Sequence, residues 1–244
     1  MAKTFRICDE AVNKRIQKML DIRKRVLEDG VEKYHPMIMK GNKKTGRQCY
    51  TVSLIPIVDC SNCKECKNNC YDIRNDCIYP DVLESRGINS AIHHADPERY
   101  WWEIGKEVEE KAIHQLRINV GGDLKKLDFK LIAKMGEGHV GDCEDLFFTK
   151  VYSDCNEFIT ENISKHPDNF GFPKSVHPLY SRWIGMNCDN PYHVPESHVL
   201  WADGTTTAPE FGAYFCKGNC SNCFNFDEGC PRLKAGESVV FNAH

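Results

Sequence analysis

Cysteine distribution is the feature that most constrains this chain. It has 244 residues and 14 cysteines, and eight of the cysteines fall in two short windows, residues 60–70 and 216–230. Cysteine-dense chains are typically small secreted domains stapled by disulfides. This chain is long enough to bury a sizeable core, and its charged N-terminus gives no indication of an export signal. Clustered cysteines in a chain of this kind indicate metal or iron–sulfur ligation rather than disulfides.

The composition otherwise describes an ordinary globular chain. Hydrophobic residues make up 41% and charged residues 27% of it, which excludes collagen-like and low-complexity classes. The longest apolar run, residues 52–58, is too short to span a bilayer. We therefore expect a cytoplasmic protein without a membrane partner.

Charge is distributed unevenly along the chain. Residues 1–47 contain 13 of the 32 Lys and Arg residues but only six Asp and Glu, so this segment carries +7 and the remainder −10. The net charge of −3 excludes a uniformly basic nucleic-acid coat. A solvated amphipathic helix is the preferred interpretation of the basic segment, and contact with nucleic acid is the alternative.

Hydrophobic periodicity predicts alternating helices and strands. Buried-type strands that alternate with helices are typical of parallel βαβ units, so we expect an α/β fold. Helices are expected over residues 10–29, 79–115 with a break near Asp96-Pro97, 124–135 and 158–163. Strands are expected over residues 49–58, 115–120, 145–152, 172–180, 198–201 and 238–241. The predicted organisation is a basic helix and loop (1–48), an α/β partial barrel with the first cysteine window (49–205) and a cysteine-rich extension (206–244).

The first window has the spacing C-x2-C-x2-C-x3-C. Its cysteines are Cys60, Cys63, Cys66 and Cys70. This is the numerical spacing of bacterial ferredoxins, although Tyr71 follows where those proteins have proline. An iron–sulfur cluster is the preferred interpretation, and a structural zinc site with four thiolates is the alternative.

The second window has the spacing C-x3-C-x2-C, followed by one more cysteine. Its members are Cys216, Cys220, Cys223 and Cys230. Four nearby thiolates would ligate a metal centre completely, so we expect a closed site that is structural or transfers electrons. A zinc ribbon is the alternative. The first window follows the first predicted strand, and there three cysteines could hold a cubane cluster whose fourth iron is open to an external ligand.

Two short segments at predicted strand ends are candidates for cofactor binding. Gly121, Gly122 and Asp123 follow one strand, and Lys150 ends another. Ligands of α/β folds bind at the carboxyl ends of parallel strands, and glycines there allow close approach of the backbone. The alternatives are a strand-to-helix turn with Asp123 as a helix cap, and a solvated charge at Lys150.

Several short blocks together resemble the phage "gene product 88" family. The blocks are Asn42-Lys43-Lys44-Thr45-Gly46, Leu54-Ile55-Pro56, the three cysteines Cys60, Cys66 and Cys70 with Tyr71, Arg117 to Asp123, Phe147 to Lys150, Cys220 with Cys223, and Val239 to His244. The chain has Asn119 where that family usually has histidine and Lys150 where it usually has arginine.

The resemblance implies a partial (β/α) barrel of the radical-SAM-like type. It further implies that Gly121, Gly122 and Asp123 hold S-adenosylmethionine beside a [4Fe–4S] cluster on Cys60, Cys66 and Cys70. Cys63 is left over, and if it ligates the fourth iron the site is closed.

Two functions from different classes are therefore expected. The first is a radical-SAM-like enzyme of phage or mobile-element type, with one open and one auxiliary [4Fe–4S] cluster and an unknown small-molecule or macromolecular substrate. The second is a non-catalytic binding protein, stapled by zinc or by closed clusters, whose basic segment contacts nucleic acid or a protein partner.

Overall fold

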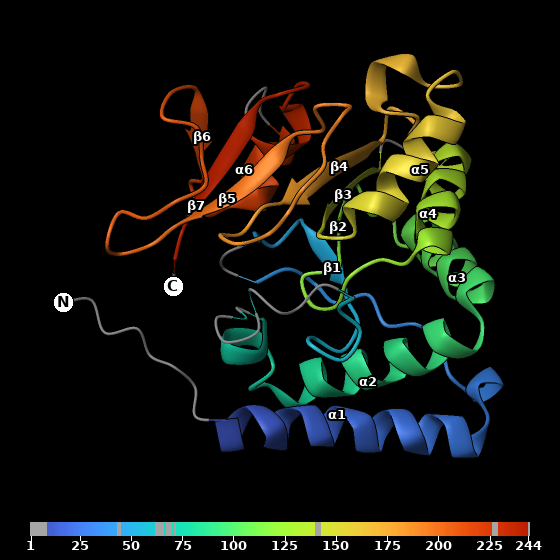
Figure 1. The fold of residues 1–244 in the computed structure, drawn as a ribbon. Helices are drawn as coiled ribbons and strands as arrows, with labels where there is room; N and C mark the ends of the chain where they lie inside the picture. Colours follow the sequence, from blue (N-terminus) through green and yellow to red (C-terminus); the bar gives the residue numbers. More distant parts are fainter. Residues whose placement is uncertain are drawn as a thin grey trace.

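A computed structural model describes residues 9–42, 45–61, 66, 70, 72–139, 143–225 and 229–243. The described chain forms a seven-stranded sheet in which every pairing is parallel, with the order β1-β2-β3-β4-β5-β7-β6 (Figure 1). The strands are β1 Tyr50–Val52, β2 Gln115–Ile118, β3 Glu144–Thr149, β4 Val176–Ser181, β5 Glu196–Leu200, β6 Ala213–Phe215 and β7 Ser238–Asn242.

Helices connect most of these strands. They are α1 Asp9–Asp29, α2 Pro80–Ala95, α3 Pro97–Glu110, α4 Lys126–Gly138, α5 Tyr152–Asn162 and α6 Cys220–Asn225. Short 3₁₀ turns cover Val31–Lys33, Pro167–Asn169 and Cys230–Arg232, and a π-helical turn covers Asp72–Asp76.

The alternation of parallel strands with helices along the chain confirms the prediction of an α/β fold. Strands β1 to β5 lie side by side in chain order, and each of the helices α1 to α5 packs against the next. In Figure 1 these helices form an arc along the bottom and right of the molecule. The sheet is open and does not close into a barrel.

The main core lies between the sheet and this arc of helices. Side chains alternate between the two faces of a strand, and Leu116, Ile118 and Phe147 bury one face of β2 and β3 in this core. Phe129 of α4 and Phe158 of α5 contribute to the same core, with ring centroids 6.4 Å apart. The helices pack their apolar sides against this face of the sheet. Apolar residues therefore recur at helical spacing in the segments that connect the strands.

The opposite face of the sheet packs against the C-terminal cysteine segment. Leu146 of β3, Leu179 of β4 and Val239 of β7 form a second buried cluster there with Phe224 and Cys230. The second cysteine window is therefore built into a core rather than appended to it.

Some predicted boundaries were wrong. The strand expected over 49–58 pairs only over Tyr50–Val52, because the chain then leaves the sheet and the Leu54 N–H donates to the Gly121 carbonyl at 3.0 Å. The short elements β6 and α6 were not foreseen. The break near residue 96 is confirmed: the Asp96 carboxylate accepts from the Arg99 N–H at 2.9 Å, which caps α3, and Pro97 begins that helix.

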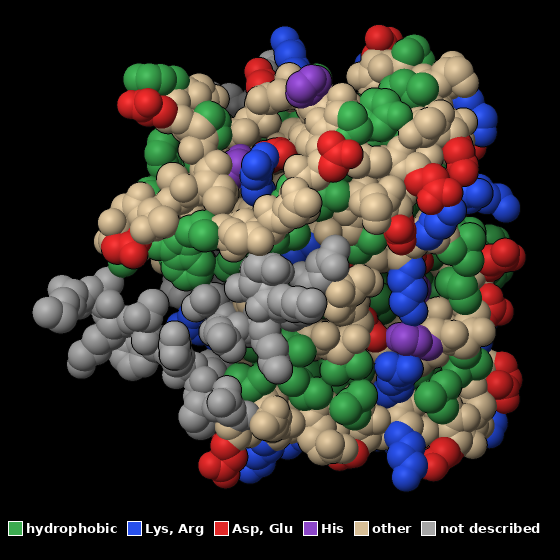
Figure 2. All heavy atoms as spheres, viewed as in Figure 1, with side chains coloured by type: hydrophobic (Ala, Val, Ile, Leu, Met, Phe, Trp, Pro, Cys, Tyr) green, Lys and Arg blue, Asp and Glu red, His purple; other side chains and the backbone are tan. Residues whose placement is uncertain are grey.

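The basic N-terminal segment is built around α1, which packs along α2. Met19 and Val26 are fully buried, Arg15 donates to the carbonyls of Ile73 and Arg74, and Arg25 pairs with Glu84. On the face shown in Figure 2, Lys and Arg side chains alternate with Asp and Glu along the helices. No helix among the described residues is long and apolar enough to cross a membrane.

Candidate metal centres

The carboxyl ends of the first three strands bring the predicted site residues together. The first cysteine window follows β1, the Gly121-Gly122-Asp123 turn follows β2, and Lys150 directly follows β3. Because all three strands are parallel, their carboxyl ends lie at one edge of the sheet. Residues separated by up to 90 positions in the chain thus meet at one place.

Three thiols of the first window and the Lys150 side chain form one electrostatic cluster. The sulfurs of Cys60, Cys66 and Cys70 all interact with the Lys150 ammonium. Partial burial lowers the pKa of Lys150, but the Cys66 sulfur, the Asp123 carboxylate and the other two sulfurs together raise that pKa above its usual value. Burial raises the pKa of Cys70 to about 12. Cys63 and Tyr71 lie outside the described residues.

Asp59 anchors the start of this window. Its buried carboxylate accepts from the Ile55 N–H at 2.9 Å and contacts His94 of α2 at 2.8 Å and Arg23 of α1 at 3.7 Å. Burial raises the pKa of Asp59, but the contacts with His94 and Ser90 lower it overall. The Asp59 carbonyl also accepts from the Asp123 N–H at 3.0 Å, so one residue fixes the cysteine loop to two helices and to the neighbouring turn.

The two glycines are required by close packing of the turn. A Cβ on Gly121 would lie 1.9 Å from the Asp72 carboxylate, and a Cβ on Gly122 would lie 2.7 Å from Leu54. Gly122 also has a φ of +81°, which disfavours other residues. The turn therefore lies directly against the segment that carries the first cysteine window.

Asp123 connects this turn to the end of β3. Its buried carboxylate accepts hydrogen bonds from the Thr149 hydroxyl at 2.7 Å and from the N–H groups of Leu124 at 2.8 Å and Lys150 at 3.0 Å. The alternative of Asp123 as a helix cap was wrong, because α4 begins three residues later and its first turn is capped by Asp128. Asp123 instead fixes the backbone from which the Lys150 side chain extends.

A second group of interacting side chains lies behind the first cysteine window and was not predicted from the sequence. The Asp72 carboxylate pairs with the buried Arg86 through two hydrogen bonds of 2.8 and 3.2 Å. The buried Cys77 thiol donates to Asp72 at 3.6 Å and interacts with Cys70. Cys77 thus joins the described thiols Cys60, Cys66 and Cys70 at this edge, and only the fold brings it there, because its spacing falls outside the cysteine window.

The four cysteines of the second window also come together. Cys216, Cys220 and Cys223 each interact electrostatically with Cys230. The hydrogen bond with the Cys49 thiol and the nearby Arg117 guanidinium hold the pKa of Cys220 below its usual value, although burial opposes this shift. The structure therefore brings the four thiols of this window into one group.

Cys49 and Arg117 complete this second centre and were missed as site residues by sequence reasoning. Arg117 of β2 donates to the Cys220 sulfur at 3.5 Å and lies 4.9 Å from the Phe148 ring centroid. The sulfurs of Cys49 and Cys230 are the other electrostatic partners of the Arg117 guanidinium. Among the described residues, no carboxylate forms an ion pair with Arg117, and its buried Nε has no hydrogen-bond partner.

The segment before β1 also packs against this centre. The Thr45 carbonyl accepts from the Ser221 N–H at 2.8 Å, and the Ser221 hydroxyl accepts from the Cys49 N–H at 3.1 Å. Thr45 and Cys49 thus lie against α6, although more than 170 positions separate them from Ser221.

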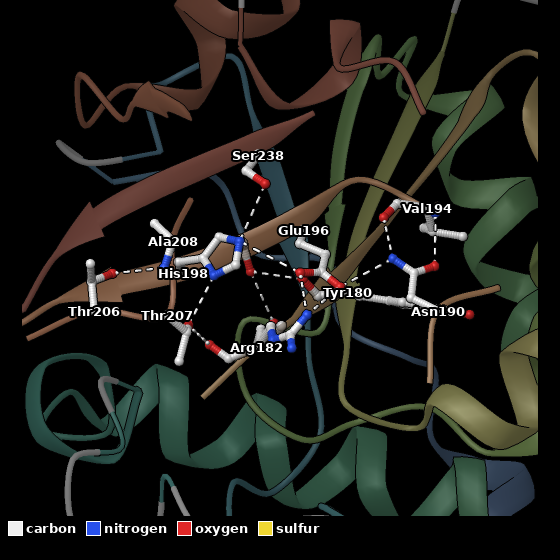
Figure 3. Close-up of polar contacts among 12 residues, drawn as sticks. Tyr180, Arg182, Asn190, Val194, Glu196, His198, Thr206, Thr207, Ala208 and Ser238 are labelled. Atoms are coloured by element: carbon white, nitrogen blue, oxygen red, sulfur yellow. Dashed lines mark hydrogen bonds and ion pairs between the residues drawn. The ribbon is translucent and has the colours of Figure 1, made fainter. Parts of the chain in front are cut away.

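A separate polar cluster lies beyond β4, around Arg182 and Glu196. Arg182 pairs with Glu196 at 3.1 Å, and Asn190 donates to the same carboxylate at 3.1 Å (Figure 3). The buried His198 contacts Thr207 at 2.9 Å and Ser238 at 3.3 Å. These side chains come from β5, from β7 and from the segments that follow β4 and β5, and they satisfy one another.

Comparison with family models, with curated proteins and with solved structures finds no match to this chain. The centres are therefore interpreted from their own residues.

Proposed function

We propose that the protein is an iron–sulfur protein of the radical-SAM-like type, with an open [4Fe–4S] cluster at the first window and a closed auxiliary cluster at the second. The observation that carries the proposal is the convergence of three thiols, Lys150 and the Asp123 turn at the carboxyl edge of the sheet. The in-order parallel sheet and the resemblance of the sequence blocks to the gene product 88 family support the same type.

The charges of the two centres favour ligated thiolates over neutral thiols. Each centre contains one cation from the sheet, Lys150 at the first and Arg117 at the second. A cation withdrawn from water is costly unless a negative charge accompanies it. For Arg117, the negative partners among the described residues are cysteine sulfurs, so protonated thiols would leave its charge uncompensated.

The sulfurs of the second window lie further apart than the thiolates of a tetrahedral zinc site would. Four thiolates around a tetrahedral zinc lie about 3.8 Å apart, given a Zn–S distance of ~2.3 Å. Among the described cysteines, no three sulfurs of this window lie within 4.8 Å of one another. A cubane separates its thiolates more widely because iron and sulfide lie between them.

In this proposal the residues near the open site ligate the cluster, position a neighbouring side chain or offset charge. Cys60, Cys66 and Cys70 would hold the cluster, which when bound supplies an electron for reductive cleavage of S-adenosylmethionine and so initiates hydrogen abstraction from a substrate. Asp123 positions Lys150, and Lys150 offsets the negative charge of the thiolates. The Gly121-Gly122 turn places backbone groups beside the same edge.

Anaerobic purification with iron, sulfide and zinc analysis tests the proposal. We expect a brown protein whose first-window iron is lost in Cys66→Ala and Cys70→Ala but retained in Cys63→Ala. Cys155→Ala, in the buried core of α5, is the matched control and should retain all iron. Added S-adenosylmethionine should change the cluster spectrum of the wild type and of Cys63→Ala.

Two other outcomes contradict the proposal. Iron loss in Cys63→Ala, with no spectral response to S-adenosylmethionine, would mean a closed first cluster without radical chemistry. A colourless protein with stoichiometric zinc would leave a zinc-stapled binding protein, and binding of nucleic acid by residues 1–47 would then be measured directly.

A further inference from the structure

A third group of ligand-type side chains lies outside both cysteine windows, where α4 meets the start of β3. His139 directly follows α4, Cys143 directly precedes β3, and Asp145 is the second residue of that strand. One ligand atom of each lies within 4.8 Å of the other two. In the part of the chain that the structure describes, no other three His, Cys, Asp or Glu side chains come this close.

The position of Asp145 is unusual for a charged residue. In the sheet register it lies between Leu116 of β2 and Val176 of β4, both of which are fully buried core residues. Asp145 is itself 0% exposed, and the His139 side chain is 2% exposed. The carboxylate accepts from His139 at 2.9 Å and from the Cys143 thiol at 3.8 Å.

Stabilisation of the fold does not by itself explain why these three side chains are buried together. Burying an ion pair usually stabilises a fold no more than apolar side chains of similar size, because both charges lose their hydration. Here a carboxylate, an imidazole and a thiol occupy core positions together, next to a sheet that is otherwise apolar at this level. A bound cation would offset that cost.

We propose that His139, Cys143 and Asp145 bind one divalent transition-metal ion of the zinc class. Nitrogen, sulfur and carboxylate oxygen are the three donor types that zinc accepts, and three protein ligands leave a fourth position for water or another small ligand. Around a tetrahedral zinc, donor atoms lie about 3.3–3.8 Å apart. The Cys143 sulfur lies 3.8 Å from Oδ1 of Asp145 and the His139 Nε2 lies 2.9 Å from Oδ2, so both groups already face the carboxylate. Small side-chain shifts would bring one oxygen, the sulfur and the nitrogen to these separations.

The charge of the loaded site suits its location. A neutral imidazole, a thiolate and a carboxylate together carry two negative charges, which balance the two positive charges of the ion. The loaded site is therefore neutral, and a neutral group is the least costly one to bury. Binding would replace the His139 and Cys143 protons that now face the carboxylate.

This inference does not depend on the proposed function, because the three ligands belong to neither cysteine window. Zinc analysis of the purified protein tests it. We expect about one zinc per chain in the wild type and a loss of one equivalent in Cys143→Ala and in Asp145→Asn, with iron and sulfide unchanged. Cys155→Ala should retain its zinc.

A second measurement covers the case in which the variants fail to fold. Zinc-edge X-ray absorption of the wild type should show a single sulfur donor with nitrogen and oxygen donors. A wild type that neither carries zinc nor binds added zinc overturns the proposal, and so does zinc with four sulfur donors. Four sulfur donors would instead place zinc in a cysteine window and contradict the proposed iron–sulfur function.

Discussion

At the scale of single residues, the two cysteine centres are defined as much by their cations as by their thiols. Arg117 lies on β2 and Lys150 directly follows the neighbouring strand β3, and each interacts with a different group of cysteines. A nearby positive charge stabilises a thiolate and makes the addition of an electron to a cluster easier. The cations should therefore influence both metal retention and reduction potential.

Substitution of Lys150 tests this influence. Methionine has nearly the same length but no charge, so Lys150→Met should lower the reduction potential of the first cluster and weaken its retention of iron. Redox titration followed by electron paramagnetic resonance, with iron analysis, measures both effects. Lys174→Met, at an exposed lysine, is the control. An unchanged potential together with unchanged iron would show that Lys150 has no role at the centre.

His198 supplies a pH-dependent prediction away from the metal centres. Burial lowers the pKa of His198, and Arg182 lowers it further while Glu196 raises it. As the pH falls below about 6.5, the unfolded chain binds a proton at this histidine more readily than the folded protein does. Folding stability should therefore decrease with falling pH, by at most ~1.4 kcal/mol per pH unit from this one group.

The measurement is the free energy of unfolding in urea at several pH values between 7.5 and 5.5. The decrease should be smaller in His198→Gln than in the wild type. His114→Gln, at an exposed histidine, should follow the wild type. Parallel curves for His198→Gln and the wild type would contradict the assignment.

Sequence reasoning found the site residues that are close in sequence and missed those that are distant. The spacing of Cys216, Cys220 and Cys223 is visible because the three lie within eight positions. Cys49 and Arg117 reach the same centre only through the pairing of β1 with β2 and the packing of α6, which no local pattern records. A lone cysteine at the start of a predicted strand carries no such signal.

At the scale of secondary-structure elements, the turn after β2 is the tightest contact near the first centre. A Cβ on Gly121 would collide with the Asp72 carboxylate and lie 3.3 Å from the Leu54 carbonyl. Gly121→Ala should therefore destabilise the protein by about 1–3 kcal/mol, in the range of overpacking substitutions, and should disturb the Asp72–Arg86 pair.

Gly138→Ala is a matched control for this substitution. Gly138 ends α4, and a Cβ there would meet nothing within 4 Å. Alanine favours a helix over glycine by up to ~1 kcal/mol, so this variant should be neutral or slightly more stable. Equal stability of the two variants in urea unfolding would show that the turn can relax without cost.

Elements with strong periodicity were predictable, and those formed by tertiary contacts were not. The helix near residues 10–29 and the break before Pro97 follow from apolar spacing and capping chemistry. The strand expected over 49–58 was too long, because the chain leaves the sheet after Val52 and Ile55 is instead buried in a cluster with Met19 of α1 and Leu83 of α2. Three-residue β6 pairs only because β7 lies beside it.

At the scale of the whole molecule, the C-terminal segment closes one face of the sheet. It supplies β6, α6 and β7, and β7 pairs directly with β5. Arg232, two residues after Cys230, forms two hydrogen bonds of 2.8 and 3.0 Å with Glu144 of β3. A metal centre on Cys216, Cys220, Cys223 and Cys230 would therefore cross-link this segment above the second apolar cluster.

Removal of the metal should consequently destabilise the molecule, and more strongly near its C-terminus. A ligand that binds only the folded state stabilises it by mass action, so the apo protein should melt clearly below the holo protein. Amide hydrogen exchange should rise first over residues 213–225 and 229–243, because these lose the cross-link directly, and least in α3 and α4, which belong to the other core.

Cys223→Ala should reproduce this pattern in the loaded protein, whereas Cys66→Ala should leave exchange in the C-terminal segment unchanged. An apo protein that melts as high as the holo form, with uniform exchange, would mean that the cysteines of the second window contribute nothing to folding through a metal.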